Sequence, residues 1–143
     1  MIIVVGLSHK TAPIAVREAL AFTKDGLPET LGRLRSEVGL DEAMVLSTCN
    51  RVEIYGHAKE SAVSALVSFL AEHHRRPSSE LDPFLYRLEG EQAVRHAFRV
   101  AASLDSMVLG EPQILGQVRE AYQIADKAGA LGSVLNALRN RSR

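Results

Sequence analysis

The fold is decided around residues 46–55, which read LSTCNRVEIY. A polar tetrad at 48–51 lies between an apolar run at 44–46 and an alternating apolar and polar run at 52–55. Two β-prone runs joined by a short polar turn predict a β-hairpin. A hairpin tip lifts its residues out of the core, and this tip carries Cys49, the only cysteine of the chain. We therefore expect the chemistry of the protein to centre on this hairpin.

Composition and spacing leave two interpretations of Cys49 open. A lone cysteine is often a small buried apolar side chain. At a strand end, followed by Asn50 and Arg51, it is also a candidate nucleophile, because a nearby guanidinium favours the thiolate over the thiol. The thiolate is the reactive form, so the second interpretation predicts an accessible and reactive sulfur.

The whole chain has the size and composition of one ordinary intracellular domain. It has 143 residues, of which 46% are hydrophobic and 24% charged. A chain of this size and composition can bury a core without disulfide bonds or bound metal ions. One cysteine excludes a disulfide framework and a cysteine-based zinc site. The apolar start at 1–6 lacks a basic region and is too short for a signal peptide or membrane span, so we expect a cytoplasmic protein without a membrane partner. Seventeen basic residues balance seventeen acidic ones, so any RNA contact has to be local.

On the N-terminal side of the hairpin, the pattern predicts one strand and two helices. Residues 2–7 are a β-branched apolar run. Thr11 is a plausible N-cap for a short helix that reaches to about Phe22. Pro28 then opens a second helix, and Gly39 is its expected stop.

On the C-terminal side, residues 59–74 have helical apolar spacing and 85–88 form a short strand candidate. The resulting order is β-α(α)-β-β-α-β with a central hairpin. It predicts an α+β fold, a ferredoxin-like antiparallel sheet with helices on one face, over residues 1–90. Helical patterns fill 91–143, including a helix that Glu111 and Pro112 open. We expect this extension to complete one domain over 1–143.

Two further polar sets are candidates for chemistry. His96 interrupts an apolar helical stripe, so it is either a satisfied core residue or, if it faces Cys49, a general acid or base. Gln113 and Gln117 are four residues apart and share a helix face, which with Ser106 and Glu111 forms either a polar substrate site or an ordinary solvated surface. The chain has no glycine-rich phosphate loop and no metal-ligand spacing, so we predict neither a dinucleotide site nor a metal site here.

Three stretches of the sequence resemble glutamyl-tRNA reductase: 6–13 (GLSHKTAP), 46–55, and the run from His96 to Tyr122. The resemblance covers essentially the whole chain and corresponds to the N-terminal catalytic domain of that family. It implies that the NADPH-binding domain and the C-terminal dimerisation helices would follow Arg143. One departure is Ser103, which stands where the family usually has glycine; because serine is small, we expect little effect.

The resemblance implies a covalent mechanism. Cys49 would attack the aminoacyl ester of glutamyl-tRNA, and the glutamyl thioester would be reduced by NADPH, bound outside this chain, to glutamate-1-semialdehyde for tetrapyrrole (5-aminolevulinate) biosynthesis. His96 would protonate the leaving tRNA hydroxyl or orient the ester, and Arg51 would hold the side-chain carboxylate of the substrate. The other expected substrate-binding residues are Thr48, Asn50, Ser106, Glu111, Pro112, Gln113 and Gln117.

The same resemblance implies partners. Besides glutamyl-tRNA, we expect glutamate-1-semialdehyde aminomutase, and a homodimer of the full-length enzyme through its C-terminal helices. This chain alone would be a monomer with the leucines at 131–138 exposed, and it would act as a slow glutamyl-tRNA esterase.

Two rival interpretations remain open from the residues alone. One is a non-catalytic ferredoxin-like ligand-binding or interaction domain with a structural cysteine. The other is a generic cysteine hydrolase, which lacks a clear third group to orient His96.

Overall fold

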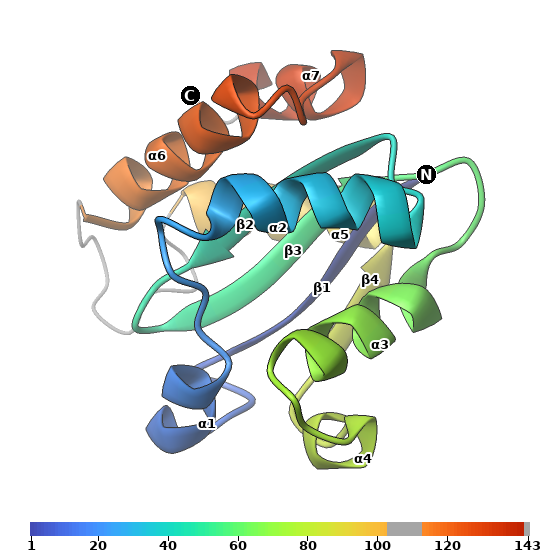
Figure 1. The fold of residues 1–143 in the computed structure, drawn as a ribbon. Helices are drawn as coiled ribbons and strands as arrows, with labels where there is room; N and C mark the ends of the chain where they lie inside the picture. Colours follow the sequence, from blue (N-terminus) through green and yellow to red (C-terminus); the bar gives the residue numbers. More distant parts are fainter. Residues whose placement is uncertain (103–112, 142–143) are drawn as a thin grey trace.

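The computed structural model describes residues 1–102 and 113–141, with 113–115 described by their backbone alone. Their centre is an antiparallel sheet in the order β2-β3-β1-β4 (Figure 1). The strands are β1 (Ile2–Ser8), β2 (Glu42–Ser47), β3 (Arg51–His57) and β4 (Tyr86–Glu89). The predicted hairpin is β2-β3, and β1 pairs with β3, so two split βαβ units interlock. The predicted ferredoxin-like α+β fold is confirmed.

Helices of the first ninety residues cover one face of the sheet. Figure 1 shows α2 (Leu27–Arg33) and α3 (Val63–His73) on the near side. α2 continues into a π-helical turn, η1 (Leu34–Val38), which ends at Gly39 with a φ of 84°. That left-handed conformation suits glycine. Two short helices, α1 (Ile14–Ala19) and α4 (Ser78–Leu81), complete this half.

The C-terminal helices cover the opposite face. They are α5 (Glu91–Ala101), α6 (Gln113–Lys127) and α7 (Ser133–Arg141), and α5 packs on β1 and β4. Directly paired residues of neighbouring strands point to the same face, so Gly6, Glu53 and Leu46, which pair across β1, β3 and β2, share the α5 side. β3 is buried from Arg51 to Gly56, which means that both faces of the sheet are covered.

A buried glutamate attaches the last helix to the hairpin. The Oε1 atom of Glu42 accepts hydrogen bonds from the backbone N–H groups of Gly132 and Leu135 at 2.7 and 2.8 Å, and Oε2 accepts one from Val134 at 3.2 Å. These are N–H groups that the first turn of a helix leaves without a backbone partner. Glu42 of β2 therefore caps α7.

Several local predictions need correction. α1 begins after Pro13 without a side-chain cap and ends at Ala19, short of Phe22. Instead of capping α1, the Thr11 hydroxyl accepts a hydrogen bond from the Ser8 N–H at 3.0 Å and so closes the turn after β1. Of the leucines expected to be exposed, Leu135 and Leu138 are buried, since α7 packs back on β2 and β3. Among the described helices, none is both long and apolar enough to cross a membrane.

Candidate functional site

The site begins at the turn between β2 and β3. The Thr48 N–H donates to the Arg51 carbonyl at 2.8 Å, and the Thr48 hydroxyl oxygen accepts hydrogen bonds from the N–H groups of Asn50 and Arg51 at 3.1 and 3.2 Å. Threonine side chains commonly close turns in this way. Cys49 is exposed at the tip. Its position does not fit the interpretation of Cys49 as a small buried residue.

Two other segments hold the same turn from outside. The His9 N–H, in the loop after β1, donates to the Asn50 carbonyl at 2.8 Å. Arg17 of α1 donates from Nε to the Cys49 carbonyl at 3.1 Å and from Nη1 to the Ala12 carbonyl at 2.6 Å. The motifs at 6–13 and 46–55, separate in the sequence, therefore form one structure around Cys49.

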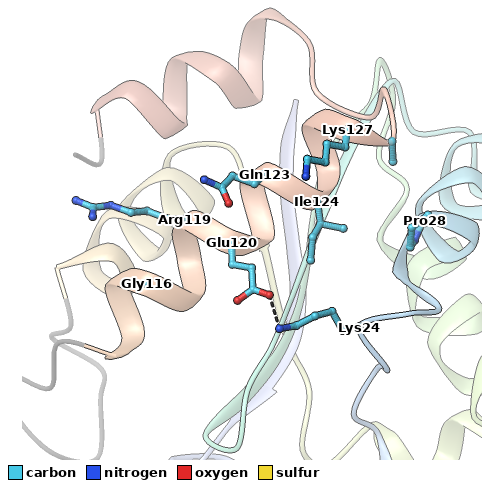
Figure 2. A pocket seen from close by; sticks show the side chains of 9 residues that line it. Lys24, Pro28, Gly116, Arg119, Glu120, Gln123, Ile124 and Lys127 are labelled. Atoms are coloured by element: carbon cyan, nitrogen blue, oxygen red, sulfur yellow. Dashed lines mark ion pairs between the residues drawn. The ribbon is translucent and has the colours of Figure 1, made fainter.

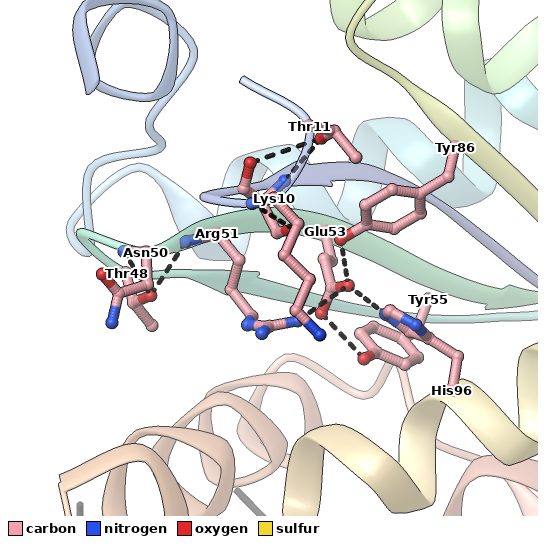
Figure 3. Close-up of polar contacts among 10 residues, drawn as sticks. Lys10, Thr11, Thr48, Asn50, Arg51, Glu53, Tyr55, Tyr86 and His96 are labelled. Atoms are coloured by element: carbon pink, nitrogen blue, oxygen red, sulfur yellow. Dashed lines mark hydrogen bonds and ion pairs between the residues drawn. The ribbon is translucent and has the colours of Figure 1, made fainter. Parts of the chain in front are cut away.

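A buried polar cluster, which we call the Glu53 cluster, lies further along β3 on the side that faces α5. Figure 3 shows the side chains of His96, Tyr86 and Tyr55 converging on the Glu53 carboxylate. Oε2 accepts a hydrogen bond from the Tyr86 hydroxyl and is paired with Nε2 of His96, while Oε1 accepts one from the Tyr55 hydroxyl at 2.9 Å. Nη1 of Arg51 lies 3.5 Å from Oε2. Glu53 and Arg51 are 0% and 1% exposed.

Gly6 makes room for this carboxylate. Its partner across the β1-β3 pair is Glu53, and a Cβ atom at position 6 would lie 2.4 Å from the Val52 carbonyl oxygen and 2.9 Å from Cγ of Glu53. Any side chain at this position would collide with the backbone of β3. Glycine is required here by close approach, which is one of its typical uses within a strand.

Burial and the contacts within the Glu53 cluster shift the pKa values of Glu53 and Tyr55. Burial alone raises the pKa of Glu53, but the hydrogen bond and charge of His96, the charge of Arg51 and the Tyr86 hydroxyl together bring that pKa below its usual value. Burial, together with the neighbouring Glu53 carboxylate, raises the pKa of Tyr55 well above its ordinary value. At neutral pH Glu53 is therefore an anion, and Tyr55 keeps the proton that it donates.

The structure brings together some of the predicted site residues. Thr48, Cys49 and Asn50 form the turn, and Arg51 and His96 meet at Glu53. Within the described residues, no hydrogen bond joins the Cys49 thiol to the His96 ring. Gln117 lies exposed on α6. Gln113 begins α6 but only its backbone is described, and three further predicted residues lie outside the described ranges: Ser106, Glu111 and Pro112.

Glu53, Arg17 and the two tyrosines that donate to Glu53, Tyr55 and Tyr86, were not predicted as site residues. Arg51 and Glu53 are opposite charges two residues apart on a strand, a spacing that places both on one face. That signal was available in the sequence. Arg17 left no comparable signal, because its contact with the Cys49 carbonyl depends on how α1 packs beside the hairpin.

A charged groove leads away from the turn along α6, and Figure 2 shows its outer part. This α6 groove consists of a hollow of about 640 Å³ and a smaller one of about 130 Å³ that share Lys24, Glu120 and Ile124. The smaller hollow reaches Ser47 and Gln117, and the larger one reaches Arg119 and Lys127. Lys24 and Glu120 form an ion pair across it. The groove therefore runs from the strand that precedes Cys49 to a basic outer end.

The described residues contain no group of three or more His, Cys, Asp or Glu side chains that could hold a metal ion. The sequence contains no glycine-rich motif of the kind that wraps a dinucleotide pyrophosphate.

Comparison with known proteins gives one consistent result. Residues 5–142 match the family model described as the N-terminal domain of glutamyl-tRNAGlu reductase. The chain is 49% identical over 142 residues to the glutamyl-tRNA reductase of Syntrophotalea carbinolica, covering 98% of this chain and 32% of that protein. It is 51% identical over 144 residues to that of Solibacter usitatus, covering 99% of this chain and 34% of that protein.

The fold is also found among solved structures. The chain is similar to glutamyl-tRNA reductase from Methanopyrus kandleri, with a TM-score of 0.83 and 30% sequence identity over 99% of this chain and 32% of that one. The chain thus spans about a third of the length of the relatives that it matches.

Proposed function

Because this chain belongs to the glutamyl-tRNA reductase family and corresponds to the N-terminal domain of that family, we propose that it performs the acyl-transfer half of the reductase reaction on glutamyl-tRNA. The observation that carries the proposal is the position of Cys49. It is exposed at the tip of a turn whose backbone is held by Thr48, His9 and Arg17. A nucleophile held this way loses little further freedom when it reacts.

The proposed step is a transesterification onto sulfur. The Cys49 thiolate attacks the ester carbonyl carbon, a C–S bond forms, and the C–O bond to the tRNA ribose breaks. The ribose oxygen takes up a proton and the tRNA leaves, so that glutamate remains on the enzyme as a thioester. Covalent catalysis of this kind divides one difficult reaction into two easier ones.

We propose His96 as the residue that assists the leaving ribose oxygen. Its Nε2 atom contacts Glu53, so Nδ1 is the ring nitrogen through which it would orient the ester or pass a proton. A carboxylate that fixes one ring nitrogen of a histidine also sets its tautomer and direction. Glu53 is thus the third group that the sequence analysis did not identify.

Recognition of the glutamyl group is assigned to Arg51. A guanidinium binds a carboxylate by paired, charge-assisted hydrogen bonds, and Glu53 keeps Arg51 in place. Since Arg51 is buried, entry of the substrate side chain has to expose it. Thr48 and Asn50 would line the pocket, and the remaining predicted residues would complete it: Ser106, Glu111, Pro112, Gln113 and Gln117.

The tRNA itself is expected to contact the α6 groove, where Arg119 and Lys127 are available to phosphate groups. Such contacts weaken with salt because bound counterions are released. We assign no reduction step to this chain, because its sequence carries no glycine-rich dinucleotide-binding motif. Hydride transfer, homodimerisation and any contact with glutamate-1-semialdehyde aminomutase are proposed for the full-length enzyme.

The proposal is tested by intact mass spectrometry of the chain, acid-quenched seconds after mixing with glutamyl-tRNA, with Cys49→Ser as the control. We expect a glutamyl adduct on the parent chain and none on the variant, together with Cys49-dependent release of free tRNA. If the parent chain shows no adduct and no Cys49-dependent release of tRNA, the proposal is contradicted. A thiol that resists alkylation until the chain unfolds would instead favour a non-catalytic domain.

A further inference from the structure

One buried cation near the nucleophile has no counter-charge. Arg17 is 7% exposed, and its two hydrogen bonds go to backbone carbonyls, those of Cys49 and Ala12. In the described part of the chain, no carboxylate pairs with it. Burying a charge without a partner of opposite sign is costly. An anion that binds during function would supply the missing counter-charge.

The other buried arginine of the site shows the contrast. Arg51 lies beside the Glu53 carboxylate, so its charge is balanced within the protein. Arg17 lies on α1 and contacts the turn at the Cys49 carbonyl oxygen, which is 3.1 Å from Nε of Arg17. Nη2 of Arg17 makes no hydrogen bond to any described residue, and it is not among the buried side-chain atoms without a partner, so solvent reaches it although the residue as a whole is 7% exposed. One side of the guanidinium is thus available directly beside the reacting residue.

We propose that Arg17 forms an oxyanion-binding subsite at Cys49, which takes a carboxylate or phosphate of the acyl substrate and draws the ester towards the thiol. The proposal rests on the proposed function only for the identity of the substrate. Glutamyl-tRNA has two anionic groups near its ester, the glutamyl side-chain carboxylate and the phosphate of the terminal nucleotide. Because Arg51 is assigned to the carboxylate, we assign Arg17 to the phosphate.

The anion subsite is tested without any tRNA, by alkylation of Cys49. Iodoacetate is anionic and iodoacetamide is neutral, and both react with the same thiolate, so the ratio of their rates reports the charge near the sulfur. We expect Arg17→Met to lower the iodoacetate-to-iodoacetamide ratio about fivefold, as loss of a charge-assisted contact of about 1 kcal/mol implies. Arg17→Lys should keep the ratio within about twofold of the parent, since it keeps the charge.

Arg35→Met is the matched control. Arg35 also donates to a backbone carbonyl, that of Gly129 at 2.7 Å, but on an exposed surface, so its loss should leave the ratio unchanged. If Arg17→Met does not fold, competition on the parent chain decides: inorganic phosphate should slow alkylation by iodoacetate more than alkylation by iodoacetamide. A folded Arg17→Met with the parent ratio, or no selective effect of phosphate, would overturn the subsite.

The two sources of the anion are separated with minimal substrates, 3′-O-glutamyl adenosine with and without a 5′-phosphate. Slower thioester formation in Arg17→Met only with the phosphorylated substrate would identify the phosphate. An equal loss with both substrates would identify the carboxylate, and no loss with either would overturn the proposal. If the parent chain forms no thioester at all, the proposed function fails, while the alkylation ratio still decides on the anion subsite.

Discussion

Two glutamates are buried on the same face of the sheet, and their partners differ. Glu42 of β2 and Glu53 of β3 are 6% and 0% exposed. Backbone N–H groups at the start of α7 hold Glu42. Side chains that carry charges or hydroxyl groups hold Glu53.

The difference separates a structural role from a role in the site. Backbone amides cannot change charge, so Glu42 attaches α7 to the hairpin through contacts that do not titrate. Glu53 sets the positions of His96 and Arg51 and depends on their charge in return. A buried carboxylate is thus informative about function only through the chemical nature of its partners.

The largest effect is expected from exchanging each carboxylate for an amide. Glu53→Gln should lower the free energy of unfolding by about 3 kcal/mol, because it removes the buried carboxylate that pairs with Arg51 and His96. It should also slow thioester formation about 100-fold, through loss of orientation of His96. Glu42→Gln should cost only about 1–2 kcal/mol of stability, as expected for a helix cap, with thioester formation within about twofold of the parent.

These two variants are compared by urea unfolding and by the rate of acylation of Cys49. Equal losses of acylation in both variants would show that the comparison is wrong and that both carboxylates act through stability alone.

The glycines that face the two carboxylates should show the next largest effect. A Cβ atom at Gly6 would lie 2.4 Å from a backbone oxygen of β3, whereas one at Gly132 would lie 2.8 Å from Cδ of Glu42. A backbone atom in a central strand cannot move aside, so Gly6→Ala should cost about 3 kcal/mol, and Gly132→Ala about 1–2 kcal/mol because a side chain can shift. Thermal unfolding of both variants measures this, and a Gly132→Ala loss at least as large as that of Gly6→Ala would contradict the packing argument.

The smallest effect is a difference in pH dependence. The pKa of Glu53 is lowered by folding, so the folded protein binds this proton less tightly than the unfolded chain does. The stabilisation from Glu53 is then complete above the unfolded value of about 4.5 and is lost as the pH falls through the folded pKa. In urea unfolding between pH 7 and pH 3, the stability gap between the parent and Glu53→Gln should therefore narrow below about pH 4.5. A gap that stays constant over this range would show that Glu53 is not held as an anion.

Much of the fold could be predicted because it is encoded locally. Alternation in residues 52–55, the polar tetrad before them and the helical spacing on both sides depend only on neighbours along the chain. The order of these elements then restricts the topology, since short connections leave few ways to arrange a sheet with a central hairpin. For the same reason Cys49 could be placed at a turn tip from the sequence alone.

The sequence by itself therefore determined the hairpin, the ferredoxin-like order of elements and the position of the cysteine in the turn, while its exposure was decided by the structure. Only the tertiary structure decided which polar residues became buried and what they contact. Alternation along β3 predicts one covered face, but α5 covers the second face and encloses Glu53 with His96. The approach of Arg17 to the Cys49 carbonyl likewise spans 32 positions of the sequence. Contacts of that range depend on how the elements pack, and no local pattern carries them.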